Sequence, residues 1–248
     1  MYVESRWQSL DKSCMIIKKY HTWQYNKQGG RSERKSLTST EQQAINQRHR
    51  AEKYAMVIKD NFVTGDYYLT ATYSDKPDTA AVPHDVDLFM GRMKYRVEKA
   101  GGKFKWLRVI ENLSGKGRPH FHILMSKVFD FETMKSIVKK IWPHGFVKID
   151  LFGGDTSDAI KMASYFSKQK IEEHAGRIST SRNLVRRPPK KHKIKRSNTW
   201  TEKMVPPPGY TLIPHLCFNG QTADGYPMQR LVCEKIETPS KRGERRNE

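Results

Sequence analysis

The sequence has few cysteines and no long apolar run. Its three cysteines, Cys14, Cys217 and Cys233, are far apart and form no Cys-x-x-Cys pair, which argues against a disulfide framework and against a zinc ribbon. No segment approaches the roughly 18 consecutive apolar residues of a membrane span, and residues 1–10 lack the apolar core of a signal peptide. We therefore expect a soluble, intracellular protein with reduced cysteines.

Acidic residues are also scarce. The chain has 26 Asp and Glu against 46 Lys and Arg, which gives a formal net charge of +20. Such an excess indicates a polyanionic partner, with nucleic acid the first expectation and an anionic membrane surface the second. No GxxxxGK[ST] phosphate-binding loop occurs, so we expect no built-in helicase motor.

Apolar periodicity predicts alternating strands and helices in the middle of the chain. Strands are expected at residues 67–73, 104–111, 120–125 and 146–151, and helices at residues 41–59, 86–100, 130–141 and 155–170. After the first helix, the order β-α-β-β-α-β plus one helix matches the split βαβ plan. The predicted fold class is therefore α+β, a ferredoxin-like or RRM-like antiparallel sheet with helices on one face and the other face free for ligand.

Composition divides the chain into four predicted segments. Residues 1–38 are polar and irregular and are expected to form a flexible arm, and residues 39–170 form the main domain with its N-terminal helix. Residues 171–196 are a basic linker, either disordered or tracking along nucleic acid. Residues 197–248 form a β-rich extension, with strands at 211–218 and 228–236 and a disordered tail.

Two histidines in one predicted strand indicate a metal site. Because side chains alternate along a strand, His120 and His122 leave the same face, while Phe121 faces the opposite layer. Glu111 ends the preceding strand, and a hairpin could bring its carboxylate beside the histidines, although by strict alternation it shares a face with core-like residues. Imidazole and carboxylate suit several divalent ions, so the three residues are candidate metal ligands. The alternative is an ordinary pair of half-buried histidines.

Tyr165 is a candidate nucleophile. On the predicted last helix the apolar side chains form one stripe, and Tyr165 falls on a flank away from it, together with Lys168 and Lys161. A phenol with a pKa of about 10 is only about a thousandth ionised near pH 7, so a tyrosine nucleophile needs nearby positive charge. The alternative is a surface Tyr-Lys pair that stabilises the helix.

The order and spacing of these residues resemble the HUH endonucleases, specifically the rolling-circle replication initiator (Rep) proteins of bacterial phages, plasmids and integrated elements. The resemblance covers residues 44–189. It rests on residues 67–73 as the first motif, His120-Phe121-His122 as the metal motif and Tyr165 with Lys168 as the nucleophile motif, with a softer match at residues 179–184. Residues 67–73 themselves read as a half-buried structural strand.

The resemblance implies a metal-dependent, site-specific endonuclease and strand transferase. It implies Mg²⁺ or Mn²⁺ held by His120, His122 and Glu111, catalysis by Tyr165 and Lys168, and a covalent 5′-phosphotyrosine intermediate. The implied partners are single-stranded DNA at a replication origin and a helicase and polymerase of the host or the element. The implied location is the cytoplasm of a bacterial host, with no membrane partner.

Two alternatives remain open at this point. A conjugative relaxase or a single-strand transposase would use the same chemistry, and a non-catalytic nucleic-acid binding protein would use only the open sheet and the basic segments. Several residues are candidates for stacking on bases or contacting phosphates: Trp106, Arg108, Lys116, Arg118, Lys161 and Arg182.

Overall fold

The computed structural model describes residues 1–23, 25, 40–113, 117–167, 178–194, 203–222 and 225–236. The chain divides into two compact units. One consists of residues 34–187, and the other combines residues 1–33 with residues 188–248. The second unit is therefore built from both ends of the chain.

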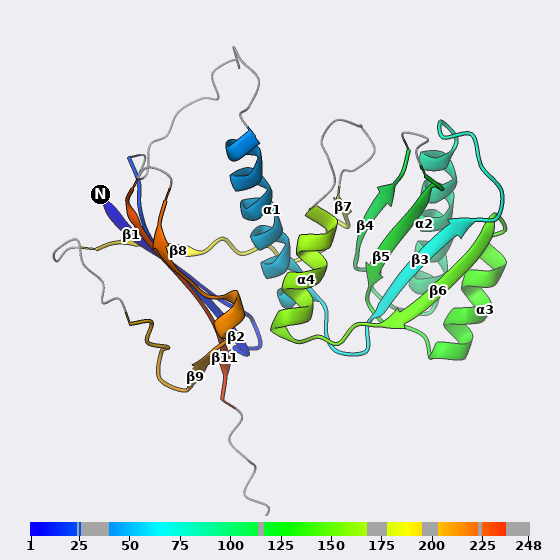
Figure 1. Ribbon diagram of the computed structural model, residues 1–248. Coiled ribbons are helices and arrows are strands. Elements are labelled where there is room, and N and C mark those ends of the chain that lie inside the picture. The colour runs from blue at the N-terminus through cyan, green and yellow to red at the C-terminus, as the bar shows by residue number, and fades with distance from the viewer. Residues whose placement is uncertain are drawn as a thin grey trace, which may run out of the picture. The chain divides into compact units, whose positions relative to one another are not determined.

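The unit of residues 34–187 is built on an antiparallel sheet (Figure 1). Its strands are β3 (Tyr67–Tyr73), β4 (Trp106–Glu111), β5 (His120–Met125), β6 (Gly145–Leu151) and β7 (Ser179–Thr180). They lie in the order β6-β3-β5-β4-β7. Strands β4 and β5 are consecutive and form a hairpin pair, as the sequence predicted.

Helices α2 (Val82–Lys99) and α3 (Phe131–Ile141) cover one face of this sheet. Their apolar stripes pack on the inward residues of the central strands, among them Leu69, Phe121 and Ile123. The N-terminus of α3 is capped by Asp130, whose carboxylate accepts a bond from the backbone N–H of Thr133. The α+β class and the split βαβ arrangement are confirmed.

The opposite face is covered over part of its extent, which corrects the prediction that it is left free. Helices α1 (Thr40–Asn61) and α4 (Thr156–Ser167) pack together, and Figure 1 shows them side by side. With Leu107, Val109 and Leu124 of the sheet, their apolar residues form a second core. The physical reason is that Ile58 and Phe166 must be removed from water, and the second sheet face is where they are buried.

The unit formed by the two chain ends contains a second antiparallel sheet. Its strands are β1 (Tyr2–Gln8), β2 (Cys14–His21), β8 (Lys190–Lys193), β9 (Tyr210–Leu212), β10 (Phe218–Gln221) and β11 (Pro227–Lys235). They follow the order β10-β11-β2-β1-β8, with β9 paired to β11. The C-terminal part of the chain is β-rich, as predicted.

Three predictions about the ends of the chain need correction. Residues 2–8 and 14–21 are paired strands rather than a flexible arm. The predicted linker contributes β7 and β8 to the two sheets, and the predicted strand at 211–218 is interrupted by the short 3-10 helix η1 (Pro214–Leu216). Pro214 lacks a backbone N–H and therefore ends the ladder there. The predicted disordered tail lies outside the described residues.

No helix in the described ranges is both long enough and apolar enough to cross a membrane.

Candidate metal centre

Strand register brings the predicted metal ligands together. Glu111, the last residue of β4, lies directly opposite His120, the first residue of β5. His122 leaves the same face two residues later, opposite Val109. No bulge is needed to free Glu111, because this face is divided: its core-forming part lies under α1 and α4, and the histidines and Glu111 occupy the end of the strands beyond it.

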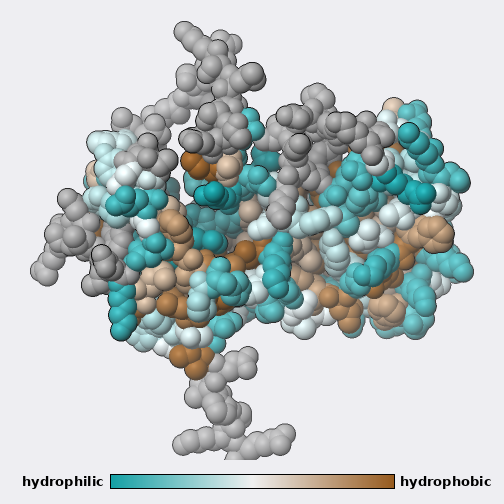
Figure 2. All heavy atoms as spheres, viewed as in Figure 1, coloured by the Kyte–Doolittle hydropathy of each residue, from teal (hydrophilic) through white to brown (hydrophobic). Residues whose placement is uncertain are grey.

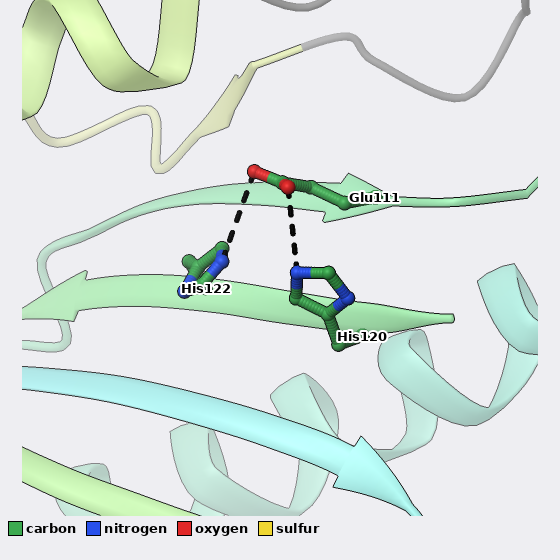
Figure 3. A group of neighbouring side chains, drawn as sticks. All are labelled: Glu111, His120 and His122. Carbon is green, nitrogen blue, oxygen red and sulfur yellow. Dashed lines mark ion pairs between the residues drawn. The ribbon is translucent and has the colours of Figure 1, made fainter. Parts of the chain in front are cut away.

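The three side chains point toward one another (Figure 3). Nε2 of His120 lies 3.3 Å from Oε2 of Glu111, and Nε2 of His122 lies 3.7 Å from its Oε1. One ligand atom from each residue falls within 4.8 Å of the others. Two imidazole nitrogens and a carboxylate at this separation fit a divalent metal ion, with room for further ligands.

The other ring nitrogen of each histidine has a partner on the side away from Glu111. Nδ1 of His120 lies 3.0 Å from the carbonyl oxygen of Arg118. Nδ1 of His122 lies 2.9 Å from the hydroxyl oxygens of both Tyr68 and Thr70. Metal-binding histidines are oriented by such contacts, because an N–H on Nδ1 leaves Nε2 free as the ligand. Both imidazoles are thus arranged to bind through Nε2.

Burial and charge set the protonation of the two histidines in opposite directions. His122 is 6% exposed, and burial lowers its pKa to about 4. The hydrogen bond with Glu111 raises the pKa of His120, against the effect of its partial burial. His122 is therefore a neutral ligand at pH 7, while His120 and Glu111 together can hold one proton that a cation would displace.

Tyr165 extends from α4 into this group. Its hydroxyl lies 3.0 Å from Nε2 of His122, and it donates a bond of 3.4 Å to Oε2 of Glu111. The ring is 43% exposed, in agreement with its predicted place away from the apolar stripe of α4. Burial of the hydroxyl, followed by the negative charge of Glu111, raises the pKa of Tyr165 to about 12. Without a cation the phenol is therefore less acidic than usual.

The candidate DNA contacts are scattered. Trp106 and Arg108 lie on the face covered by α2 and α3, where Trp106 packs on the core and Arg108 pairs with Asp87 of α2. The structure does not bring them to the metal group. Arg118 is exposed next to it, and Lys161 and Arg182 are exposed elsewhere on the same unit. Lys116 and Lys168 lie outside the described residues.

Tyr68 and Thr70, which hold His122, were not among the predicted site residues. A signal was present, because they alternate in β3 with the buried Leu69 and Ala71 and so had to leave the opposite face. What the sequence did not give was the register, which pairs Thr70 with His122.

Comparison with known protein families agrees with this geometry. The fold and the site define an α+β domain in which a tyrosine lies beside a candidate metal centre. Residues 66–170 match the model of a family of replication-associated proteins, named for the protein ORF2. The matched segment contains Glu111, His120, His122 and Tyr165, so the resemblance to replication initiators is confirmed there.

Two further comparisons add little. Among solved structures, the chain is similar to the hypothetical protein ORF119 from Sulfolobus islandicus rod-shaped virus 1, with 17% identity over 49% of this chain and 97% of that chain. The TM-score is 0.32, and a likeness of this degree identifies neither function nor fold. The search of curated proteins gives no match.

Proposed function

We propose that this protein is a Rep-type initiator of rolling-circle DNA replication that nicks and rejoins single-stranded DNA at an origin. The observation that carries the proposal is the place of Tyr165, whose hydroxyl lies 3.0 Å from His122 and 3.4 Å from Glu111. A potential nucleophile thus lies within hydrogen-bond reach of a metal-binding group. The family match of residues 66–170 supports a role in replication.

The proposed metal ligands are His120, His122 and Glu111, and the proposed ion is Mg²⁺ or Mn²⁺. The donor set fits, since two Nε2 atoms and one carboxylate converge while both Nδ1 atoms are engaged elsewhere. When bound, the ion would polarise the scissile phosphate and offset its negative charge. The residues also orient the substrate phosphate toward α4, because Tyr165 reaches the same point.

The proposed reaction begins with attack by the Tyr165 oxygen on phosphorus. A bond forms between the tyrosine oxygen and phosphorus, and the bond to the 3′-oxygen breaks, which leaves a 5′-phosphotyrosine and a free 3′-OH. The carboxylate of Glu111, which already accepts from the phenol, is placed to receive its proton. The free 3′-OH would prime synthesis, and the reverse attack would rejoin the strand.

Other proposed participants lie beyond the described residues or outside this chain. Lys168 follows Tyr165 by three positions and is proposed to position the phosphate and neutralise its charge. Strand separation and synthesis are assigned to a helicase and a polymerase of the host or the element, because the chain has no phosphate-binding loop of its own.

The test uses single-stranded DNA from the candidate origin of the parent element, labelled at either the 5′ or the 3′ end. Incubation with Mn²⁺ should give a cut product and a protein-linked product on a denaturing gel, and a chelator should abolish both. Tyr165→Phe should bind the DNA but form no covalent product. A normal amount of linked product from that variant would overturn the assignment of the nucleophile.

A further inference from the structure

The metal group continues across the sheet into two rows of side chains on one face. Each row crosses the strands at one register position. The first row runs from Glu111 through His120 and Thr72 to Phe146, and the second contains His122, Thr70 and Lys148. The half of this face on β4 and β5 carries the metal group, and the half on β3 and β6 lies directly beside it.

Phe146 is unusually exposed for a phenylalanine in a strand. It is 70% exposed, whereas its neighbours Val147 and Ile149 alternate with it or with Lys148 and pack against the main core on the other face. Its position is fixed by the strand, which pairs Phe146 with Thr72. Strand β6 is also the edge of the sheet, and Figure 2 shows hydrophobic residues among hydrophilic ones on the surface of this unit. A large apolar ring held out on an edge strand is a liability unless it meets a partner.

The residue beside Phe146 on this face carries a positive charge. The side chain of Lys148 is 74% exposed and forms an ion pair of 2.9 Å with Asp150, which is 42% exposed. An ion pair this open to solvent contributes little, so the ammonium can exchange the carboxylate for a phosphate. Exposed Arg118 precedes the metal strand, and its carbonyl orients His120. An aromatic ring with flanking cations is the arrangement that binds single-stranded nucleic acid.

We propose that the β3-β6 half of this face is a binding platform for single-stranded DNA, on which Phe146 stacks with an unpaired base and Lys148 contacts a backbone phosphate. This inference rests on the proposed function and names how its substrate is held. Two strand spacings separate Phe146 from His120, which is about 10 Å. At about 3.4 Å of rise per nucleotide, the stacked base lies within a few nucleotides of the scissile phosphate.

The experiment measures binding without cleavage. Fluorescence anisotropy is recorded with a labelled oligo-dT strand, because stacking tolerates any base. Protein carrying Tyr165→Phe is used in the presence of a chelator, so that neither metal nor chemistry contributes. Phe146→Ala is compared with Phe146→Tyr, which keeps the aromatic face. Tyr95→Ala is the matched control, since Tyr95 is 61% exposed and belongs to α2 on the other side of the sheet.

Phe146→Ala should weaken binding of the single strand by about five-fold to a hundred-fold. Phe146→Tyr and Tyr95→Ala should bind as the parent does, and binding of a blunt duplex should be the same for all. Lys148→Ala should lower the slope of log K against log salt by about 0.7, whereas Phe146→Ala should leave that slope unchanged.

Equal affinity of Phe146→Ala and Tyr95→Ala for the single strand would overturn the platform, whether or not the protein cuts DNA. The converse result is also distinguishable. If wild-type protein never cuts or links DNA but Phe146→Ala loses affinity selectively for single strands, the nicking function fails and the platform stands. Circular dichroism melting checks that Phe146→Ala is folded, which is expected because the ring is exposed.

Discussion

The hydroxyl groups that hold His122 provide a sharp test of the metal centre. Nδ1 of His122 has two acceptors at the same distance, 2.9 Å, from Tyr68 and Thr70. A neutral imidazole that binds metal through Nε2 has a single N–H on Nδ1, and either hydroxyl can accept it. Tyr68→Phe and Thr70→Val should therefore each have a small effect on metal affinity, below about ten-fold, since the other hydroxyl remains.

The double variant should behave differently. With both hydroxyls removed, the N–H of a side chain that is 6% exposed loses its acceptors. An unsatisfied buried donor costs about 1–3 kcal/mol. The expected loss in Mn²⁺ affinity is about ten-fold to a hundred-fold. The effects should therefore be more than additive, which a double-mutant cycle measures directly.

Isothermal titration calorimetry with Mn²⁺ is the assay. Thr72→Val is the matched control, because Thr72 is on the same strand and face but its hydroxyl donates to the carbonyl of Phe146. That variant should bind Mn²⁺ as the wild type does. A double variant with unchanged affinity, or two single effects that simply add, would refute the reasoning that the hydroxyls share one function.

Three further predictions address the ligands and the fold. His120→Ala and Glu111→Ala should each weaken Mn²⁺ binding more than ten-fold or so by calorimetry, and unchanged affinity in either variant would remove that residue from the metal group. Leu124→Ala should lower the free energy of unfolding in urea by about 2–5 kcal/mol because Leu124 is 0% exposed in the core under α1 and α4; a loss no greater than that of the control Val63→Ala, which is 67% exposed, would contradict this packing. Asp130→Ala should cost about 1 kcal/mol by the same measurement through loss of the cap of α3, and an unchanged value would show that the cap is unimportant.

The sequence predicted the elements of the main unit well because their signals are local. Alternation gave β3 and β5, and the apolar stripe with its Asp130 cap gave α3. The placement of Tyr165 away from the stripe of α4 also followed from local spacing. Each of these signals depends only on residues a few positions apart.

Features that depend on distant pairing were not predictable in the same way. Strands β1 and β2 looked like an irregular polar arm, because their partners β8 and β11 come from the last quarter of the chain. The division of one sheet face between a core and a site likewise depends on where α1 and α4 end. For that reason Glu111 looked buried by alternation, although it lies beyond the helices.

Trp106 and Arg108 show a different kind of error. Their alternation with Leu107 and Val109 already placed them on the face opposite the histidines once β4 and β5 were paired. The sequence contained this information, and residue type alone suggested a DNA contact. The exposed ring of Phe146 was read only as part of a strand, since its exposure depends on β6 being the edge.

The most direct test of the central claim is to locate the covalent link between protein and DNA. Wild-type protein is incubated with origin single-stranded DNA and Mn²⁺, digested with nuclease and protease, and mapped by mass spectrometry. The account predicts a nucleotide attached to the peptide that contains Tyr165 and to none of the other tyrosines, of which the sequence has 11 in total. A nucleotide on a different tyrosine, or cleaved DNA with no link to the protein, would contradict it.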